Sequence, residues 1–196
     1  TGRRRRPLVI EAPRGRGKST ILGQAVVDLL GHRSAHIQVV MPHAHSALPL
    51  LRQVESFLGH PLVLSKRIHI AEDRSITVLT MEQLWDMNAP ADVIFVDEAA
   101  TFPVHLLSRL LNKTSRIVFS TTTAGYEGTG QGFRLRFDPM LREKYPNRRF
   151  VALQTPVRWA PNDPVETWAS NTFCLDSKMV RCIENNHPVL VQYQDR

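Results

Sequence analysis

The stretch Pro7-Leu-Val-Ile-Glu-Ala-Pro-Arg-Gly-Arg-Gly-Lys-Ser19 decides the fold of this chain. It begins with a short apolar run typical of a buried strand and continues through a glycine-rich loop. From Lys18 onward, apolar residues recur at the three- and four-residue spacing of a helix, which Gly31 is expected to end. Apart from an alanine in place of its first glycine, the loop matches the phosphate-binding P-loop pattern. The sequence therefore predicts a nucleotide site near the start of the chain.

Each residue type in this loop suits a contact with a nucleotide. Glycines let the backbone turn closely around phosphate oxygens, the amine of Lys18 can reach the β- and γ-phosphates, and the hydroxyl of Ser19 can coordinate Mg²⁺. Arg14 and Arg16 are unusual here and could face solvent, the nucleotide or another polyanion. A glycine turn that only caps a helix is the alternative. The residues predicted to bind the nucleotide are Arg14, Gly15, Arg16, Gly17, Lys18, Ser19 and Thr20.

Strands and helices alternate along the rest of the chain. This alternation predicts an α/β fold of the P-loop NTPase (RecA-like) type, a parallel sheet with helices on both faces. The 196 residues are enough for one such domain but not for two. After the P-loop helix, the pattern indicates strands near 37–41, 76–79, 93–96, 117–119 and 150–155, and helices at 48–58, after Pro103 and after Pro164.

Two acidic residues end the apolar run 93–96. Asp97 is predicted to share a magnesium ion with Ser19, and Glu98 to act as the general base that polarises the attacking water. An acidic pair at a strand end is common by itself, but its combination with an upstream P-loop predicts Mg-dependent nucleotide hydrolysis. ATP is favoured over GTP because no guanine-recognition motif is found in the sequence.

Other candidates follow the next apolar run. In Phe119-Ser-Thr-Thr-Thr123, a hydroxyl can sense the γ-phosphate, so Thr121 is a catalytic candidate, although the hydroxyls could equally satisfy a turn. The glycine-rich segment 125–132 could approach a phosphate or a base, or form an ordinary loop. Arg158 is a candidate arginine finger that neutralises charge on the transferring phosphoryl group. Its stacking on Trp159 is the alternative.

The composition excludes several other classes of protein. Hydrophobic residues at 42% and charged residues at 22% are globular values, and no apolar run approaches the roughly 18–20 residues of a membrane span. Two cysteines without metal-ligand spacing favour a reducing, intracellular compartment. The net charge is +7, and basic residues concentrate in 1–20 and 134–149. A nucleic acid is therefore an expected partner, with a solvated basic surface as the alternative.

Taken together, the motifs resemble those of one enzyme family. In order and spacing they are similar, over about residues 8–176, to the RecD-like helicase (ATPase) module of the tRNA(Met) cytidine acetyltransferase family. The resemblance implies that hydrolysis of ATP or GTP assists N4-acetylation of a cytidine in RNA, and that Arg158 contacts the nucleotide. The segments that carry it are Arg14–Ser19, Val96–Ala100, Ser120–Thr122, the glycine string Gly125–Phe133, which is more specific than a P-loop, and Pro156–Ala160.

The organisation implied by this resemblance is a P-loop ATPase domain over residues 1–176. Residues 177–196 would then be an extension that leads into an acetyltransferase domain, and no acetyl-CoA loop follows Asp176. We expect an Mg-dependent NTPase that positions or remodels RNA, specifically tRNA, with acetyl-CoA bound only by a domain of a larger parent protein. The expected location is the cytoplasm, or the nucleolus of a eukaryotic cell, without a membrane partner. A stand-alone helicase or translocase ATPase and a non-hydrolysing, nucleotide-dependent RNA-binding scaffold are the alternatives.

Overall fold

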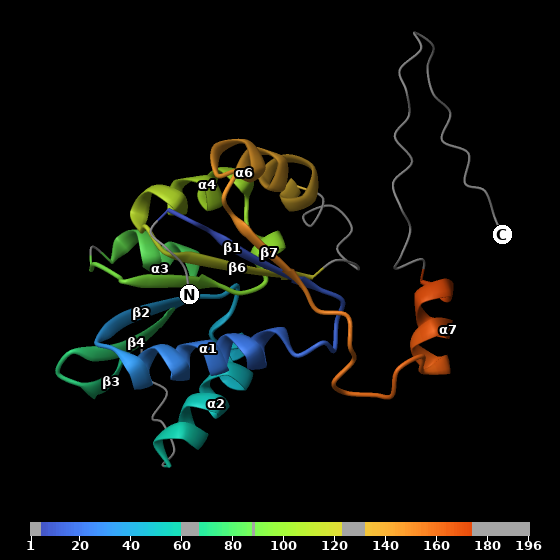
Figure 1. The fold of residues 1–196 in the computed structure, drawn as a ribbon, viewed down its shortest axis with the longest axis horizontal. Helices are drawn as coiled ribbons and strands as arrows, with labels where there is room; N and C mark the ends of the chain where they lie inside the picture. The colour runs from blue at the N-terminus through green and yellow to red at the C-terminus, as the bar shows by residue number, and fades with distance from the viewer. Residues whose placement is uncertain (1–4, 60–66, 88, 123–131, 174–196) are drawn as a thin grey trace, which may run out of the picture.

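The computed structural model describes residues 5–59, 67–87, 89–122 and 132–173 (Figure 1). The strands are β1 (Leu8–Ala12), β2 (Ala35–Val40), β3 (Arg67–Ala71), β4 (Arg74–Leu79), β5 (Val93–Val96), β6 (Ile117–Thr122) and β7 (Arg149–Ala152). The helices are α1 (Lys18–His32), α2 (Leu48–Leu58), α3 (Met81–Asp86), α4 (Val104–Lys113), α6 (Asp138–Lys144) and α7 (Pro164–Thr172). Shorter helical turns lie at Ala44–Ala47, Ala99–Thr101 and Phe133–Phe137.

These strands form a seven-stranded sheet in the order β3-β4-β2-β5-β6-β1-β7. All neighbouring strands are parallel except β3, which pairs antiparallel with β4. The predicted parallel α/β sheet is confirmed, with one antiparallel edge strand added. Because β6 lies between β1 and β5, the carboxyl ends of these three parallel strands meet at one edge of the sheet. That edge carries the P-loop, the hydroxyl residues and the acidic pair.

Helices cover both faces of the sheet, as predicted (Figure 1). On one face, α1 and α2 bury apolar side chains such as Leu22, Val26 and Leu50 against the strands. On the other face, α3, α4 and α6 pack over a second apolar cluster that includes edge-to-face contacts of Phe119 and Phe137, with ring centroids 5.0 Å apart. Full burial of each such side chain stabilises the fold by about 1.5–3 kcal/mol, so the strand ends are held on a rigid base.

The first helix is longer than the sequence pattern predicts. The sequence predicts that Gly31 ends this helix, yet α1 continues to His32, and the backbone N–H of Arg33 closes the last turn on the carbonyl of Leu29 at 3.1 Å. The expectation for Gly31 was wrong because Arg33 turns directly into an extended conformation, so no left-handed residue is needed at the helix end.

The chain leaves the sheet after β7 and ends its described part in α7. Figure 1 shows α7 outside the two helix layers, beyond the end of β1 that leads into the P-loop. Its first turn is capped by Asp163, whose Oδ1 accepts the backbone N–H groups of Val165 and Glu166 at 2.8 and 3.2 Å. The connection 153–163 therefore joins β7 to a helix with a capped first turn.

Candidate functional site

The P-loop adopts a backbone that only glycine accommodates easily. Gly15 and Gly17 both have φ of 75°, in the left-handed region, and Gly17 is the N-cap of α1. A Cβ on Gly15 would lie 2.4 Å from the ring of Trp159, and one on Gly17 would lie 3.3 Å from Val157. The loop is therefore constrained by its own conformation and by the segment that crosses it.

Lys18 occupies the first position of α1 and is 8% exposed. Its Nζ lies 3.5 Å from the carbonyl oxygens of Ala12 and Pro13, on the inner side of the loop. Burial lowers the pKa of Lys18, while the nearby carboxylates of Glu98 and Asp97 raise it. A buried ammonium group of this kind would gain an interaction partner from the phosphates of a nucleotide.

Ser19, in the first turn of α1, and Asp97, directly after β5, come together in the fold. The Ser19 hydroxyl donates to Asp97 Oδ2 at 2.7 Å, across 78 positions of sequence. Asp97 is 1% exposed, and this burial raises the pKa of its carboxyl, against the lowering effect of the Ser19 hydrogen bond. The structure therefore places both predicted magnesium ligands at one point beside Lys18.

This oxygen pair fits a magnesium ion that arrives with a nucleotide. Mg²⁺ prefers oxygen ligands and is usually held by one or two side chains together with waters and substrate phosphates. Within residues 5–59, 67–87, 89–122 and 132–173, no group of three or more His, Cys, Asp or Glu could hold a metal ion. Ser19 and Asp97 would therefore hold the ion with help from the phosphates rather than as a closed protein site.

Glu98 adopts an unusual backbone conformation next to this point. Its φ of 50° lies in the left-handed region, which for a residue other than glycine costs of order 1–3 kcal/mol and often marks a functional position. Asp97 Oδ1 accepts the Glu98 backbone N–H at 3.0 Å, and Glu98 Oε2 accepts the hydroxyl of Thr122 at 3.1 Å. The side chain of Glu98 is thus directed toward the end of β6.

Thr122 makes this contact with Glu98, next to Thr121, the residue predicted to sense the γ-phosphate. The hydroxyl of Thr121 is buried and has no hydrogen-bond partner among the described residues. Successive residues of a strand point to opposite faces, so only one of the two can meet Glu98 directly. The sequence indicated a run of hydroxyls, but choosing between them required the position of β6 beside β5. The glycine string that follows lies outside the described residues up to position 131.

Arg158 lies in the segment that crosses the P-loop. The backbone N–H of Val157 donates to the carbonyl of Gly15 at 3.0 Å, which ties this segment to the loop. Arg158 is exposed and lies close enough to Lys18, as does Arg14, for its charge to lower the pKa of Lys18 further. The structure therefore brings Arg14, Lys18 and Arg158 around one loop, whereas Thr20 is exposed on the first turn of α1.

A clasp of three side chains was not predicted. Arg16 donates to Glu166 Oε1 at 2.7 Å and to the carbonyl of Gln154 at 2.8 Å, and Trp159 Nε1 donates to Glu166 Oε2 at 2.5 Å. The Arg16 guanidinium also lies 5.8 Å from the Trp159 ring centroid, which is within range of a cation–π contact between these two side chains. The hydrogen bonds from Arg16 and Trp159 lower the pKa of Glu166. Arg16 therefore anchors the loop to α7.

The fold and the site together define a P-loop NTPase-type domain. The family model of the RNA cytidine acetyltransferase NAT10/TcmA helicase domain matches residues 9–176. The chain belongs to this family, which confirms the resemblance found in the sequence.

Curated relatives and solved structures agree with this assignment. The tRNA(Met) cytidine acetyltransferase TmcA of Nitrosococcus halophilus is 42% identical over 90% of this chain, and that of Vibrio cholerae is 37% identical over 91%. The chain spans only 24% and 25% of the length of these two relatives. Among solved structures, the large terminase of a thermophilic bacteriophage superposes with a TM-score of 0.63, at 12% identity, over 86% of this chain and 45% of the terminase. The same terminase in complex with ADP superposes with a TM-score of 0.55, at 11% identity, over 76% of this chain and 40% of the terminase.

The likeness to the terminases supports the fold alone.

Across the parts of the chain that the structure describes, no helix has the length and apolar character needed to cross a membrane.

Proposed function

We propose that this chain is the Mg-dependent NTPase module of an RNA cytidine N4-acetyltransferase, and that it couples ATP hydrolysis to the positioning or remodelling of tRNA. The observation that carries the proposal is the 2.7 Å contact of Ser19 with Asp97 beside the buried amine of Lys18. Serine, aspartate and lysine at the end of a P-loop are the groups that hold Mg²⁺ and the β- and γ-phosphates in nucleotide hydrolysis. The structure of a terminase with ADP is consistent with a nucleotide as the ligand of such a fold.

The nucleotide-binding role falls to the loop and to Lys18. Gly15 and Gly17 expose backbone N–H groups to the phosphates, and the start of α1 adds the positive end of its dipole. Lys18 exchanges its contacts with loop carbonyls for phosphate oxygens. When bound through Ser19 and Asp97, magnesium neutralises phosphate charge.

The hydrolytic role falls to Glu98, with Arg158 and the two threonines. Glu98 accepts a proton from the attacking water, because its carboxylate is held at the end of β5 by Thr122. Thr121 and Thr122 sit at the strand end where loss of the γ-phosphate can be sensed, with Thr122 in direct contact with Glu98. Arg158 neutralises charge that develops on the transferring phosphoryl group.

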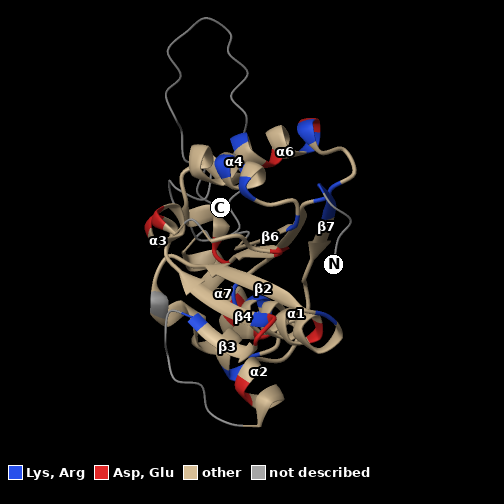
Figure 2. Cartoon of the chain, turned by 90° about the vertical axis from the view of Figure 1, so that its left-hand side faces the viewer, with Lys and Arg blue, Asp and Glu red and all other residues tan. Residues whose placement is uncertain are grey.

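The RNA-binding role is proposed for the basic surface. Figure 2 shows Lys and Arg on α4, α6 and β7. Within 134–149, Arg142 and Arg148 both pair with Asp138, at 2.9 and 3.0 Å, so these two are partly neutralised. The basic residues of this segment that remain exposed for phosphate contacts are Arg134, Arg136, Lys144 and Arg149.

Acetyl-CoA belongs, in this proposal, to another domain of the parent protein. The relatives named above are tRNA(Met) cytidine acetyltransferases of which the chain spans 24% and 25%, which leaves room for such a domain. A tRNA-modifying enzyme acts where its tRNA is, and we therefore propose a cytoplasmic location.

Thermal stability in Mg-ATP tests the nucleotide site. At a ligand concentration of 100 times Kd, binding stabilises a protein by about 2.7 kcal/mol, which for a domain of this size raises Tm by roughly 5–10 °C. The wild-type chain should show this shift, Lys18→Ala should lose it, and Lys144→Ala, a lysine on the exposed face of α6, should keep it. An equal shift in wild type and Lys18→Ala would show that the P-loop is not where ATP binds.

A further inference from the structure

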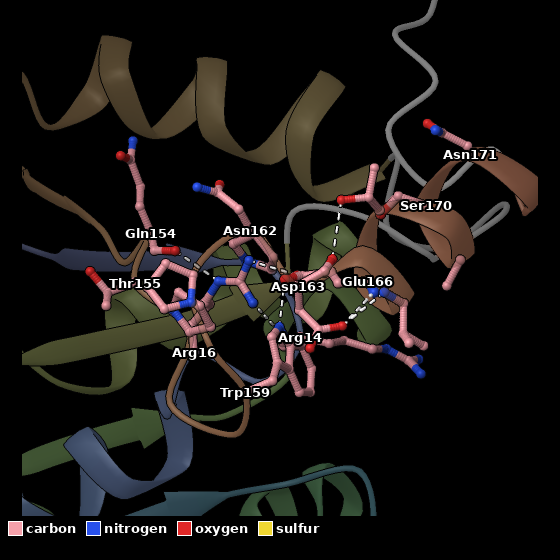
Figure 3. Close-up of a pocket in the computed structure, with 16 residues that line it drawn as sticks. Arg14, Arg16, Gln154, Thr155, Trp159, Asn162, Asp163, Glu166, Ser170 and Asn171 are labelled. Carbon is pink, nitrogen blue, oxygen red and sulfur yellow. Dashed lines mark hydrogen bonds and ion pairs between the residues drawn. The ribbon is translucent and has the colours of Figure 1, made fainter.

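Two cavities lie at the edge of the sheet opposite the P-loop and its clasp of Arg16, Trp159 and Glu166 (Figure 3). The larger, of about 680 Å³, is bounded by the ends of α4 and α6 and by the segments that precede β1, β6 and β7. The smaller, of about 180 Å³, lies between α4 and α6. Because the two cavities share four lining residues, they form one continuous groove, which we call the amino-edge groove. The shared residues are Leu111, Asn112, Lys144 and Tyr145.

The amino-edge groove is remote from the nucleotide site. Strands β1, β6 and β7 are parallel, so their amino ends meet at this edge, while the carboxyl ends of β1 and β6 carry the P-loop and the hydroxyl residues. The two edges are separated by the length of the strands, which is roughly 17 Å for the six residues of β6. A ligand in the groove would therefore not compete with a nucleotide for space.

The charge of the groove is of one sign. Its charged lining residues are Arg5, Arg109, Lys113 and Lys144, and no aspartate or glutamate is among the described residues that line it. Helices α4 and α6 lie next to each other and carry Lys and Arg (Figure 2). Both helices end at the groove, where Lys113 and Lys144 offset the partial negative charge of their last carbonyls. The groove therefore presents positive charge to solvent.

Two of these cations are free to reach a ligand. Arg5 and Lys144 are exposed, and within the described parts of the chain neither side chain makes a hydrogen bond or an ion pair. By contrast, the amine of Lys113 is held by two carbonyls at the end of α3, at 3.1 and 3.2 Å. The backbone N–H of Arg5 donates to the carbonyl of Ser115 at 2.7 Å. Arg5 is therefore fixed at its backbone while its charge remains available.

The uncharged lining suits a nucleotide chain rather than an isolated anion. Tyr145 lines both cavities and provides an aromatic surface on which a base can stack. Asn112 and Asn147 are exposed, and their amides can form hydrogen bonds with phosphate oxygens or ribose hydroxyls. A single phosphate would occupy only part of the groove. A strand with a phosphate at every nucleotide could engage Arg5 and Lys144 together.

We propose that the amino-edge groove binds a single-stranded segment of RNA, with phosphates at Arg5 and Lys144 and one base against Tyr145. This inference rests on the proposed function, in which tRNA is the partner, and adds a binding site at a stated place. Of the basic residues proposed above for phosphate contacts, only Lys144 belongs to the groove. ATP and RNA would then bind at opposite edges of the sheet at the same time.

Removal of the two available charges tests the groove. Binding of an oligouridylate of about 12 nucleotides is measured on the full 196-residue chain over a series of salt concentrations. Each phosphate contact with a single strand contributes about 0.7 to the slope of log affinity against log salt. The double variant Arg5→Ala/Lys144→Ala should therefore lose about 1.4 of this slope and bind roughly 25-fold more weakly at about 0.1 M salt. Arg52→Ala/Arg67→Ala, which removes two exposed arginines of α2 and β3, is the matched control and should change neither quantity.

A second variant separates stacking from charge. Tyr145→Leu keeps an apolar side chain against the apolar cluster under α4 and α6 but removes the aromatic ring. It should weaken RNA binding at least about fivefold without changing the salt slope, because a stacked base adds no phosphate contact. The increase in Tm caused by Mg-ATP should persist in both variants, since the P-loop lies at the other edge, and it also reports that the variants are folded.

Other outcomes would overturn the inference. Unchanged affinity and slope in Arg5→Ala/Lys144→Ala, an equal loss in the control, or wild-type affinity in Tyr145→Leu would show that the RNA does not lie in this groove. Loss of binding to phosphatidylserine vesicles in the double variant, with RNA binding unchanged, would assign the groove to a membrane surface instead. A wild-type chain that binds Mg-ATP but no RNA would refute the RNA-binding role in the proposed function, and with it the groove. Failure of the groove alone would leave wild-type RNA binding intact.

Discussion

Replacement of the buried Asp97 by asparagine separates metal binding from phosphate binding. The amide keeps the shape of the carboxyl but removes the charge that faces the hydroxyl of Ser19 at 2.7 Å. Interactions of a charged group of this kind contribute about 1.5–3 kcal/mol, so the gain in ATP affinity caused by Mg²⁺ should fall roughly 10- to 100-fold. ATP binding measured without Mg²⁺ should change little, because Lys18 and the loop N–H groups remain.

The pH dependence of the same variant gives the sign of the effect. Burial raises the pKa of Asp97 above 3.8, so just above that value the folded chain still holds a proton that the metal must displace. Mg-dependent affinity should therefore rise more steeply with pH in wild type than in Asp97→Asn, in which only the phosphates of ATP, with a pKa of about 6, still titrate. In the chain without nucleotide, the raised pKa means that the folded state binds more protons than the unfolded state, so its stability falls as pH rises through the window. Asp97→Asn removes that loss, and its Tm at neutral pH should be equal to or above that of wild type.

Calorimetric titrations of ATP, with Mg²⁺ and with a chelator, at a series of pH values above the ordinary carboxyl pKa of 3.8 would measure this prediction on both proteins. The reasoning would be refuted by an Asp97→Asn protein whose affinity rises with Mg²⁺ as much as that of wild type. A Tm several degrees below wild type would show instead that the carboxylate is needed for the fold.

Three further changes probe the loop and its neighbours. Burial lowers the pKa of Lys18 below 10.5, so the affinity of the wild-type chain for ATP should fall as pH rises through the lowered pKa. Lys18→Met should bind ATP weakly and show no such loss of affinity in titrations up to about pH 10. Thr122→Val removes a hydrogen bond to Glu98 and should lower turnover roughly tenfold with unchanged ATP affinity, whereas a larger loss in Thr121→Val would assign the sensing role to that residue. Gly15→Ala adds a Cβ 2.4 Å from the Trp159 ring at a φ of 75°, and should destabilise the chain by about 1–3 kcal/mol; an unchanged urea midpoint would show that the segment carrying Trp159 is not held on the loop.

Local sequence patterns were sufficient for the central sheet and for placing the candidate site at the carboxyl ends of its strands. The P-loop and the acids after the strand at 93–96 each carry their own signal, and parallel pairing brings the two strand ends together once the fold class is known. Ser19 and Asp97 were therefore predictable as partners, although they are far apart in the chain.

Contacts without a local signal were not predictable. The bond between Arg16 and Glu166 joins positions 150 apart. Arg16 was marked by its place in the P-loop, but nothing in the sequence around Glu166 distinguishes it from an ordinary surface charge. Most side chains of the antiparallel strand β3 are exposed or half-buried. Its sequence therefore lacks the apolar run that marks a buried strand. The choice between Thr121 and Thr122 depends on which face of β6 meets the end of β5, which a strand pattern alone does not give.

Steady-state ATP hydrolysis by this chain with Mg²⁺, with and without tRNA(Met), tests the central claim most directly. Glu98→Gln keeps the shape of the proposed base without its charge, and Glu143→Gln on the exposed surface of α6 is the matched control. The account predicts turnover that rises with tRNA, is lost in Glu98→Gln while ATP still binds, and persists in Glu143→Gln. Turnover that is the same in Glu98→Gln as in wild type, or that does not respond to tRNA, would contradict it.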